Sequence, residues 1–189
     1  DHLIETMGTL KFKITSKSFY QTNPKQAYAL YELVKSFAAL EGNEIVYDLY
    51  SGTGTITLFL AALCKKIVGV ESIPEAVEDA KYNAQINQVK NATFEVGDMK
   101  HIFDKTFIEK HGKPDLIVAD PPRDGMHKKV IHQIIALQAP KLIYVSCNSA
   151  TQARDLEKLS CIYNLEISQA VDLFPQTSHV ENVVLLRRK

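Results

Sequence analysis

The sequence is poor in cysteine, with three in 189 residues, and this limits the stabilising sites it can carry. Cys64, Cys147 and Cys161 are an odd set without the paired spacing of zinc ligands. A disulfide framework or a metal site is therefore not expected, and each cysteine is interpreted first as a reduced thiol. For Cys64 and Cys161 we predict buried, inert side chains.

The chain also lacks a long apolar run and an excess of one charge. No stretch approaches the length of a membrane span and no charged-then-apolar leader opens the sequence, so a cytoplasmic location is expected. The 22 basic residues balance the 22 acidic ones. Because free-standing RNA-binding proteins usually carry a basic excess, either this domain binds no RNA or its main RNA-binding surface lies elsewhere in a longer protein. The first methionine is Met7, and we favour the interpretation as a fragment.

No repeat, low-complexity tract or long linker divides the sequence, and its length fits one domain over residues 1–189. Five short apolar runs are each followed by a helix-like segment, an alternation that predicts a doubly wound α/β fold with a mostly parallel sheet. The expected strand and helix pairs are 45–49 with 56–64, 67–70 with 74–86, 93–96 with 99–110, 116–119 with 128–137, and 142–145 with 151–159.

The two ends of the chain depart from this alternation. Residues 165–173 and 183–186 are expected to form two strands joined without a helix, which predicts an antiparallel end to the sheet. Before the first pair, residues 10–14 are expected to form a strand and residues 24–40 a helix with Asn23 as its N-cap.

The residues that follow the first three strands are typical of a nucleotide-like cofactor site. In such sheets, ligands bind beyond the carboxyl ends of the strands. Gly52 and Gly54 would let the backbone approach a ligand, and Glu71 stands where an acid can accept hydrogen bonds from ribose hydroxyls. Asp98 is equally compatible with an adenine contact and with a turn. A dinucleotide is disfavoured because Thr57 replaces the third glycine of that fingerprint, and this favours S-adenosylmethionine.

Two further strand ends carry groups suited to chemistry. Asp120 precedes two prolines and Arg123, a turn that would hold the carboxylate at the sheet edge. Cys147 follows the fifth strand, where the next helix N-terminus is expected to favour its thiolate. Glu181 lies between the two tail strands and could face the same site, although a loop glutamate is more often a solvated charge.

These motifs together resemble the catalytic domain of the RNA 5-methyluridine methyltransferases, over about residues 18–189. The matching motifs are Ser18-Phe19-Tyr20-Gln21-Thr22-Asn23, Asp48-Leu49-Tyr50-Ser51-Gly52-Thr53-Gly54, Asp120-Pro121-Pro122-Arg123, Ser146-Cys147-Asn148 and Phe174-Pro175-Gln176-Thr177-Ser178-His179-Val180-Glu181. Two positions differ from the residue that is frequent in the family: Ser51 stands where cysteine is frequent, and Ser149 where proline is frequent. Neither position carries a catalytic atom.

The resemblance implies a fold, an activity and a set of site residues. The fold would be a Rossmann-like class I methyltransferase with a seven-stranded sheet and an antiparallel final strand. Cys147 would be the nucleophile and Glu181 the general base. The expected cofactor-binding residues are Gln21, Tyr50, Gly52, Gly54, Thr55, Glu71, Asp98 and Asp120, and the expected substrate contacts are Phe19, Asp120 and Arg123.

The predicted activity is transfer of a methyl group from S-adenosylmethionine to C5 of a uridine in RNA, ribosomal RNA being favoured over transfer RNA. The attack of Cys147 on C6 would activate C5. The resemblance also implies an N-terminal RNA-binding barrel outside this chain, and we expect a monomer that does not associate with membranes. Methylation of cytosine C5 or of an amino nitrogen, or a non-catalytic binding module, are the alternatives.

Overall fold

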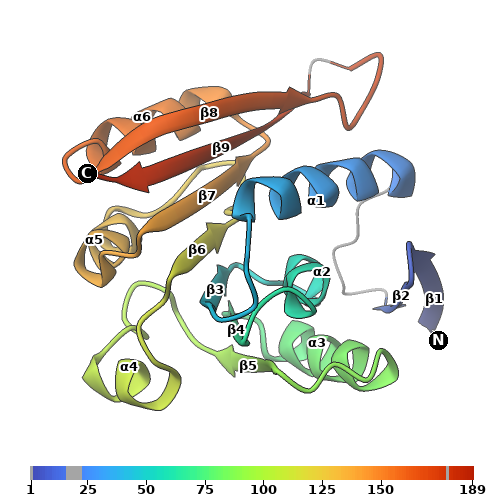
Figure 1. Ribbon diagram of the computed structural model, residues 1–189. Helices are drawn as coiled ribbons and strands as arrows, with labels where there is room; N and C mark the ends of the chain where they lie inside the picture. Colours follow the sequence, from blue (N-terminus) through green and yellow to red (C-terminus); the bar gives the residue numbers. More distant parts are fainter. Residues whose placement is uncertain (1, 16–22, 178) are drawn as a thin grey trace.

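A computed structural model describes residues 2–15, 23–177 and 179–189, which form a two-stranded hairpin, a seven-stranded sheet and six helices (Figure 1). The strands are β1 (His2–Met7), β2 (Leu10–Thr15), β3 (Ile45–Leu49), β4 (Lys66–Glu71), β5 (Ala92–Val96), β6 (Leu116–Ala119), β7 (Lys141–Ser146), β8 (Tyr163–Val171) and β9 (Glu181–Arg188). The helices are α1 (Pro24–Ala38), α2 (Thr55–Ala61), α3 (Pro74–Ile86), α4 (Lys105–His111), α5 (Lys128–Leu137) and α6 (Ser149–Leu159).

The large sheet has the strand order β5-β4-β3-β6-β7-β9-β8. Strands β3 to β7 pair in parallel, and β9 runs antiparallel to both β7 and β8. The strand order reverses between β3 and β6, which is where doubly wound sheets bind their ligands. The predicted α/β fold with an antiparallel end is confirmed.

Two apolar cores lie on opposite faces of this sheet. One contains the buried side chains of α1, α2 and α3, and the other those of α4, α5 and α6. Successive side chains of a strand point to opposite faces, so Val145 of β7 belongs to the first core and Tyr144 to the second. This alternation fixes which groups at the strand ends face the same side.

Most predicted elements are observed, and α1 begins as expected, with the Asn23 side chain accepting a hydrogen bond from the Gln26 amide. Three expectations were wrong or incomplete. The hairpin partner of β2, strand β1, was not foreseen, and the helix expected from residue 99 begins only at Lys105 because Asp104 caps it. Cys161 is exposed, unlike the buried Cys64, because it lies in the turn before β8.

Within residues 2–15, 23–177 and 179–189, the helices are too short or too polar to span a lipid bilayer. The same part of the chain holds no group of three or more His, Cys, Asp or Glu side chains that could bind a metal ion.

Candidate functional site

Four acidic groups and one thiol lie at the ends of neighbouring strands, on the face covered by α1, α2 and α3. Asp48 and Glu71 lie in β3 and β4, while Asp120 and Cys147 directly follow β6 and β7. Glu181 opens the antiparallel strand β9, so it lies at the same edge as the ends of the parallel strands. Asp48 and Glu181 each lie two positions along their strand from a valine of the first core, and Glu71 lies two positions from Gly69, where a Cβ atom would meet the Phe94 ring of that core. Because side chains two positions apart in a strand share a face, these three acids point to the first core.

Asp48 is the most deeply buried of these acids, with 1% of its surface exposed. One carboxylate oxygen accepts a hydrogen bond of 2.5 Å from the Thr57 hydroxyl at the start of α2. The other oxygen, like the buried Ser51 hydroxyl, has no partner among the described residues. Burial raises the pKa of Asp48 to about 7, the Thr57 hydrogen bonds oppose the increase, and the negative charge of Glu71 adds to it.

Glu71 is held by the turns that follow β3 and β4. One of its oxygens accepts a hydrogen bond from the Gly52 amide at 3.1 Å, and the other accepts from the amides of Ser72 and Ile73 and from the Ser72 hydroxyl. The carboxylate is thus fixed beside the glycine turn, and its expected contact with ribose hydroxyls remains a prediction.

The two glycines of this turn have different surroundings, although both have positive φ values. A side chain at Gly52 would meet no atom within 4 Å, so the space above this residue is open. A Cβ atom at Gly54 would lie 3.0 Å from the Phe94 ring and 3.1 Å from Ala80. Gly54 is therefore needed for internal packing, whereas Gly52 leaves room for a ligand.

Three other predicted cofactor residues, Tyr50, Thr55 and Asp98, belong to the described part of the chain. Tyr50 is half-buried, and burial together with the charges of Asp155 and Asp98 raises its pKa to about 12. Thr55 is half-buried as the first residue of α2. Asp98 is exposed after β5 and accepts a hydrogen bond from the Lys100 amide, which is the main reason that its pKa is lowered. Gln21 and Phe19 lie outside the described residues.

Asp120, Cys147 and Glu181 influence one another electrostatically. Burial, then Glu181 and then Asp48 raise the pKa of Asp120 to about 8. Burial raises the pKa of Glu181. The Cys147 thiol also has a raised pKa, because burial and the charges of Glu181 and Asp120 outweigh its own backbone amide and Arg123.

The α6 N-terminus was expected to favour the Cys147 thiolate, but in the free protein other influences outweigh such a contribution. The partial burial of the thiol, and then the charges of the nearby carboxylates, favour its neutral form. A carboxyl group beside a neutral thiol is also a group that can take its proton.

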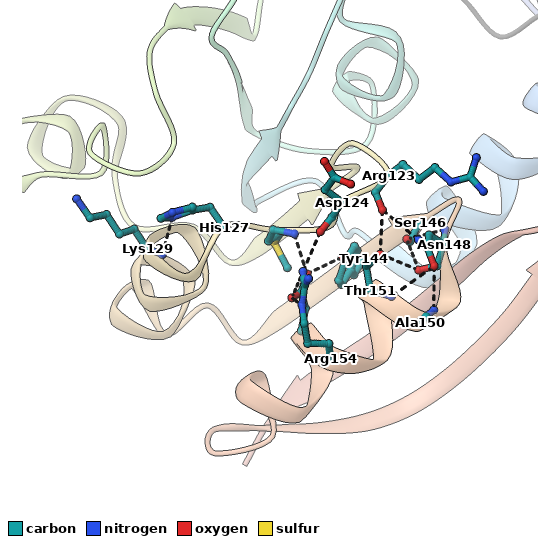
Figure 2. A network of polar contacts seen from close by, with 12 residues as sticks. Arg123, Asp124, His127, Lys129, Tyr144, Ser146, Asn148, Ala150, Thr151 and Arg154 are labelled. Carbon is teal, nitrogen blue, oxygen red and sulfur yellow. Dashed lines mark hydrogen bonds and ion pairs between the residues drawn. The ribbon is translucent and has the colours of Figure 1, made fainter.

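The loop that carries Asp120 is fastened to the first turns of α6 (Figure 2). The Arg123 carbonyl accepts hydrogen bonds from the Asn148 side-chain amide at 3.3 Å and from the Thr151 hydroxyl at 3.1 Å. The Asp124 carbonyl accepts from the Arg154 guanidinium at 2.9 Å. Arg123 itself is exposed, so its guanidinium is free to meet a ligand at the edge of the site.

Asp155 of α6 also holds the segment that follows Asp120, and it was not identified from the sequence. It is fully buried, and one oxygen accepts hydrogen bonds from the Met126 amide at 2.7 Å and from the Tyr144 hydroxyl at 3.0 Å. The other oxygen pairs with Arg154 at 2.9 Å. A polar residue inside a helix gives no sign in the sequence that it is buried, so only the tertiary structure identifies it.

The sequence model of the tRNA (uracil-5-)-methyltransferase family matches residues 5–189. The chain belongs to this family. Proteins of Bacteroides thetaiotaomicron and Porphyromonas gingivalis, each named an uncharacterized RNA methyltransferase, are 54% and 52% identical over 186 and 190 residues. The match covers 98% and 100% of this chain but 41% of each relative, so the chain spans about two fifths of their length.

A solved structure of this type is similar along nearly the whole chain. The tRNA (uracil-54, C5)-methyltransferase of Pyrococcus abyssi, in complex with S-adenosyl-L-homocysteine, is 34% identical with a TM-score of 0.84. The match covers 98% of this chain and 44% of that protein. The resemblance inferred from the five motifs is thereby confirmed at the level of family and fold.

Proposed function

We propose that this domain transfers a methyl group from S-adenosylmethionine to C5 of a uridine in RNA through a covalent bond between Cys147 and C6. The observation that carries the proposal is the electrostatic coupling of Cys147, Glu181 and Asp120 at neighbouring strand ends. A thiol and two carboxyl groups in one region are the groups that this reaction requires.

The residues at the sheet edge fit the sulfonium cofactor. Glu71 stands beside the open space at Gly52, and the buried Asp48 keeps one oxygen without a described partner. Several acids with raised pKa values in one region favour a ligand with a positive charge. When bound, S-adenosylmethionine supplies an electrophilic methyl group. The residues proposed to hold it are Gln21, Tyr50, Gly52, Gly54, Thr55, Glu71, Asp98 and Asp120.

The protein's own residues supply the rest of the reaction. Cys147 passes its proton to a neighbouring carboxylate, and its sulfur forms a bond to C6 of uracil, which moves electron density to C5 and O4. After C5 has gained the methyl group, it still carries a proton. Glu181 takes that proton, the C5–C6 double bond re-forms, and the bond between Cys147 and C6 breaks. The raised pKa of Glu181 suits a group that must accept a proton.

The substrate is proposed to be a uridine in a loop, or one turned out of a helix, because C5 and C6 are inaccessible in a stacked duplex. Phe19, Asp120 and Arg123 are proposed to contact it. Ribosomal RNA remains our preferred substrate and a monomer the preferred state, while the Pyrococcus abyssi relative is named for uracil-54 of tRNA. Most of the RNA contacts are proposed to lie outside this chain.

The test uses the Cys147→Ala and Glu181→Gln variants of the intact protein with 5-fluorouridine RNA and with uridine RNA. Cys147→Ala is expected to bind the cofactor and form no covalent adduct. Glu181→Gln is expected to accumulate a methylated covalent complex, because attack proceeds while elimination fails. The exposed Cys161 provides the matched control, and Cys161→Ala should behave as wild type.

Two results would overturn the proposal. An adduct that persists in Cys147→Ala would place the nucleophile elsewhere, and rapid turnover by Glu181→Gln would remove the general base. A nucleoside digest of the product that contains 5-methylcytidine or a methylated amino group, rather than 5-methyluridine, would assign the domain to another methylation reaction.

A further inference from the structure

Gln152 in the first turn of α6 is 1% exposed and forms three hydrogen bonds to the strands beneath it. Its amide nitrogen donates to the main-chain carbonyls of Tyr144 at 3.0 Å and Asn182 at 3.1 Å. Its amide oxygen accepts from the Asn182 side chain at 2.7 Å. One side chain therefore holds both the backbone and the side chain of Asn182, and it fastens them to β7.

These contacts lie between the two groups assigned to the reaction. Asn182 directly follows Glu181 and pairs with Ser146 in the sheet, and Ser146 directly precedes Cys147. The strand alternation turns Asn182 toward α6 and Glu181 toward the opposite face, and the charge of Glu181 acts on the Cys147 thiol. The contact with Gln152 is thus made on the α6 face of the sheet, opposite to the face toward which Glu181 points.

We propose that Gln152 is a positioning residue for Glu181, fixing the first residues of β9 so that the carboxylate meets the C5 proton of the covalent intermediate. This inference rests on the proposed function. Gln152 does not touch the substrate, and it acts through Asn182 on the strand that presents the base.

The position of Gln152 in the chain explains why such a contact is useful. Glu181 is the first residue of β9 and pairs with Val171, the last residue of β8, so it lies in the final pair of that ladder. The Asn182 side chain also bonds the Ser168 hydroxyl of β8 at 3.2 Å, which connects β7, β8, β9 and α6 at one point. A misplacement of about 1 Å can cost roughly 100-fold in rate, so a small shift of Glu181 would suffice to slow proton removal.

The inference predicts a selective defect in one step. In Gln152→Met, which keeps the length of the side chain and removes its hydrogen bonds, the rate of adduct formation with 5-fluorouridine RNA should remain within about 2-fold of wild type, because Cys147 is unchanged. Turnover with uridine RNA should fall by roughly 10- to 100-fold, and the methylated covalent complex should accumulate. Asn182→Ala should show the same selective defect.

The decisive comparison places Gln152→Met in the Glu181→Gln background. If Gln152 acts through Glu181, the second substitution should slow elimination no further. Tyr163→Phe is the matched control for the loss of a buried hydrogen bond, because the Tyr163 hydroxyl donates to the Ala139 carbonyl at 2.9 Å in the interior and makes no contact with β9 residues near Glu181 that the structure describes. Tyr163→Phe should lower the stability without accumulation of the complex.

Three outcomes would overturn the inference: wild-type turnover by Gln152→Met, an equal loss in adduct formation and turnover, or a further loss of elimination in the double variant. They are distinct from a failure of the proposed function, in which the wild-type protein would itself form no adduct at Cys147.

Discussion

Burial and the neighbouring Glu181 carboxylate together raise the pKa of Asp120 to about 8. Asp48 contributes to the same increase, and its own pKa is raised to about 7, mainly by burial. The acids at the strand ends therefore share a region in which negative charge is unfavourable. This arrangement favours the protonated acids, or a bound cation, over several ionised carboxylates.

The stability of the free protein should depend on Asp120 in a pH-dependent way. Its pKa in the folded state, about 8, lies above the ordinary value of 3.8, so the folded state holds more protons between these values. The stability that the raised pKa of Asp120 contributes to the folded state is fully present below pH 3.8 and is lost as the pH rises toward 8. Asp120→Asn cannot ionise, so its stability relative to wild type should be greater at about pH 8.5 than at about pH 4.5, by roughly 1–3 kcal/mol.

Urea unfolding at both pH values measures this difference without cofactor. The exposed Asp172 provides the control, and Asp172→Asn should show no comparable dependence on pH. A free-energy difference between Asp120→Asn and wild type that is the same at both pH values would contradict the prediction.

The same carboxylates should suppress the reactivity of the Cys147 thiol. Burial and the charges of Glu181 and Asp120 raise its pKa, so less thiolate is available at a given pH. Glu181→Gln removes a negative charge and is expected to increase the alkylation rate of Cys147 by about 3- to 10-fold. Mass spectrometry after iodoacetamide treatment at about pH 8 measures the rate at each cysteine.

The exposed Cys161 in the same molecule gives the reference rate. It should react faster than Cys147 in the wild-type protein and equally fast in both proteins. If Cys147 reacted at the same rate with and without the Glu181 carboxylate, the proposed electrostatic coupling would not operate.

The fold was predictable from the sequence because its signals are local. The buried strands β3, β6 and β7 are largely apolar, and the Pro at the start of α3 and the Asn23 cap of α1 mark helix boundaries. Strand β1 was missed because its described side chains are mostly exposed and, in the part of the chain that the structure describes, it pairs with β2 alone, so burial leaves no clear pattern in the sequence.

From the sequence, the site could be predicted only where a residue type suited to chemistry stands at the end of an expected strand. The motifs indicated Asp120, Cys147 and Glu181, and the structure brings these three together. Gln152 and Asp155 could not be found in this way, because both belong to a helix whose pattern does not distinguish a buried polar group from a solvated one. The raised pKa of Cys147 could not be predicted either, because the burial that causes most of it and the charges of Glu181 and Asp120 come from segments distant in the sequence.

The two glycines of the turn after β3 should respond differently to the same substitution. Gly54→Ala is expected to destabilise the protein by about 2–4 kcal/mol, because its φ of 84° is unfavourable and its Cβ would crowd Phe94. Gly52→Ala has a φ of 52° but open space, so only about 1 kcal/mol should be lost.

For Gly52→Ala the main effect should appear in ligand binding. A methyl group above this residue would occupy the space proposed for the cofactor, and a loss of affinity for S-adenosyl-L-homocysteine of about 10-fold or more is expected by calorimetry. Unchanged affinity in Gly52→Ala would place the cofactor away from this turn.

Asp155 should hold the loop that presents Asp120 and Arg123. The Asp155→Ala variant leaves the Met126 amide and the Tyr144 hydroxyl without their partner, so a loss of roughly 2–4 kcal/mol in unfolding free energy is expected. Because the attached loop contains the exposed Arg123, its release should also speed trypsin cleavage after this residue under native conditions.

The exposed Glu157 on the same helix supplies the control, and Glu157→Ala should change the stability by less than about 0.5 kcal/mol and leave cleavage unaffected. Faster global unfolding without preferential cleavage after Arg123 would mean that Asp155 stabilises the core and does not fasten the loop.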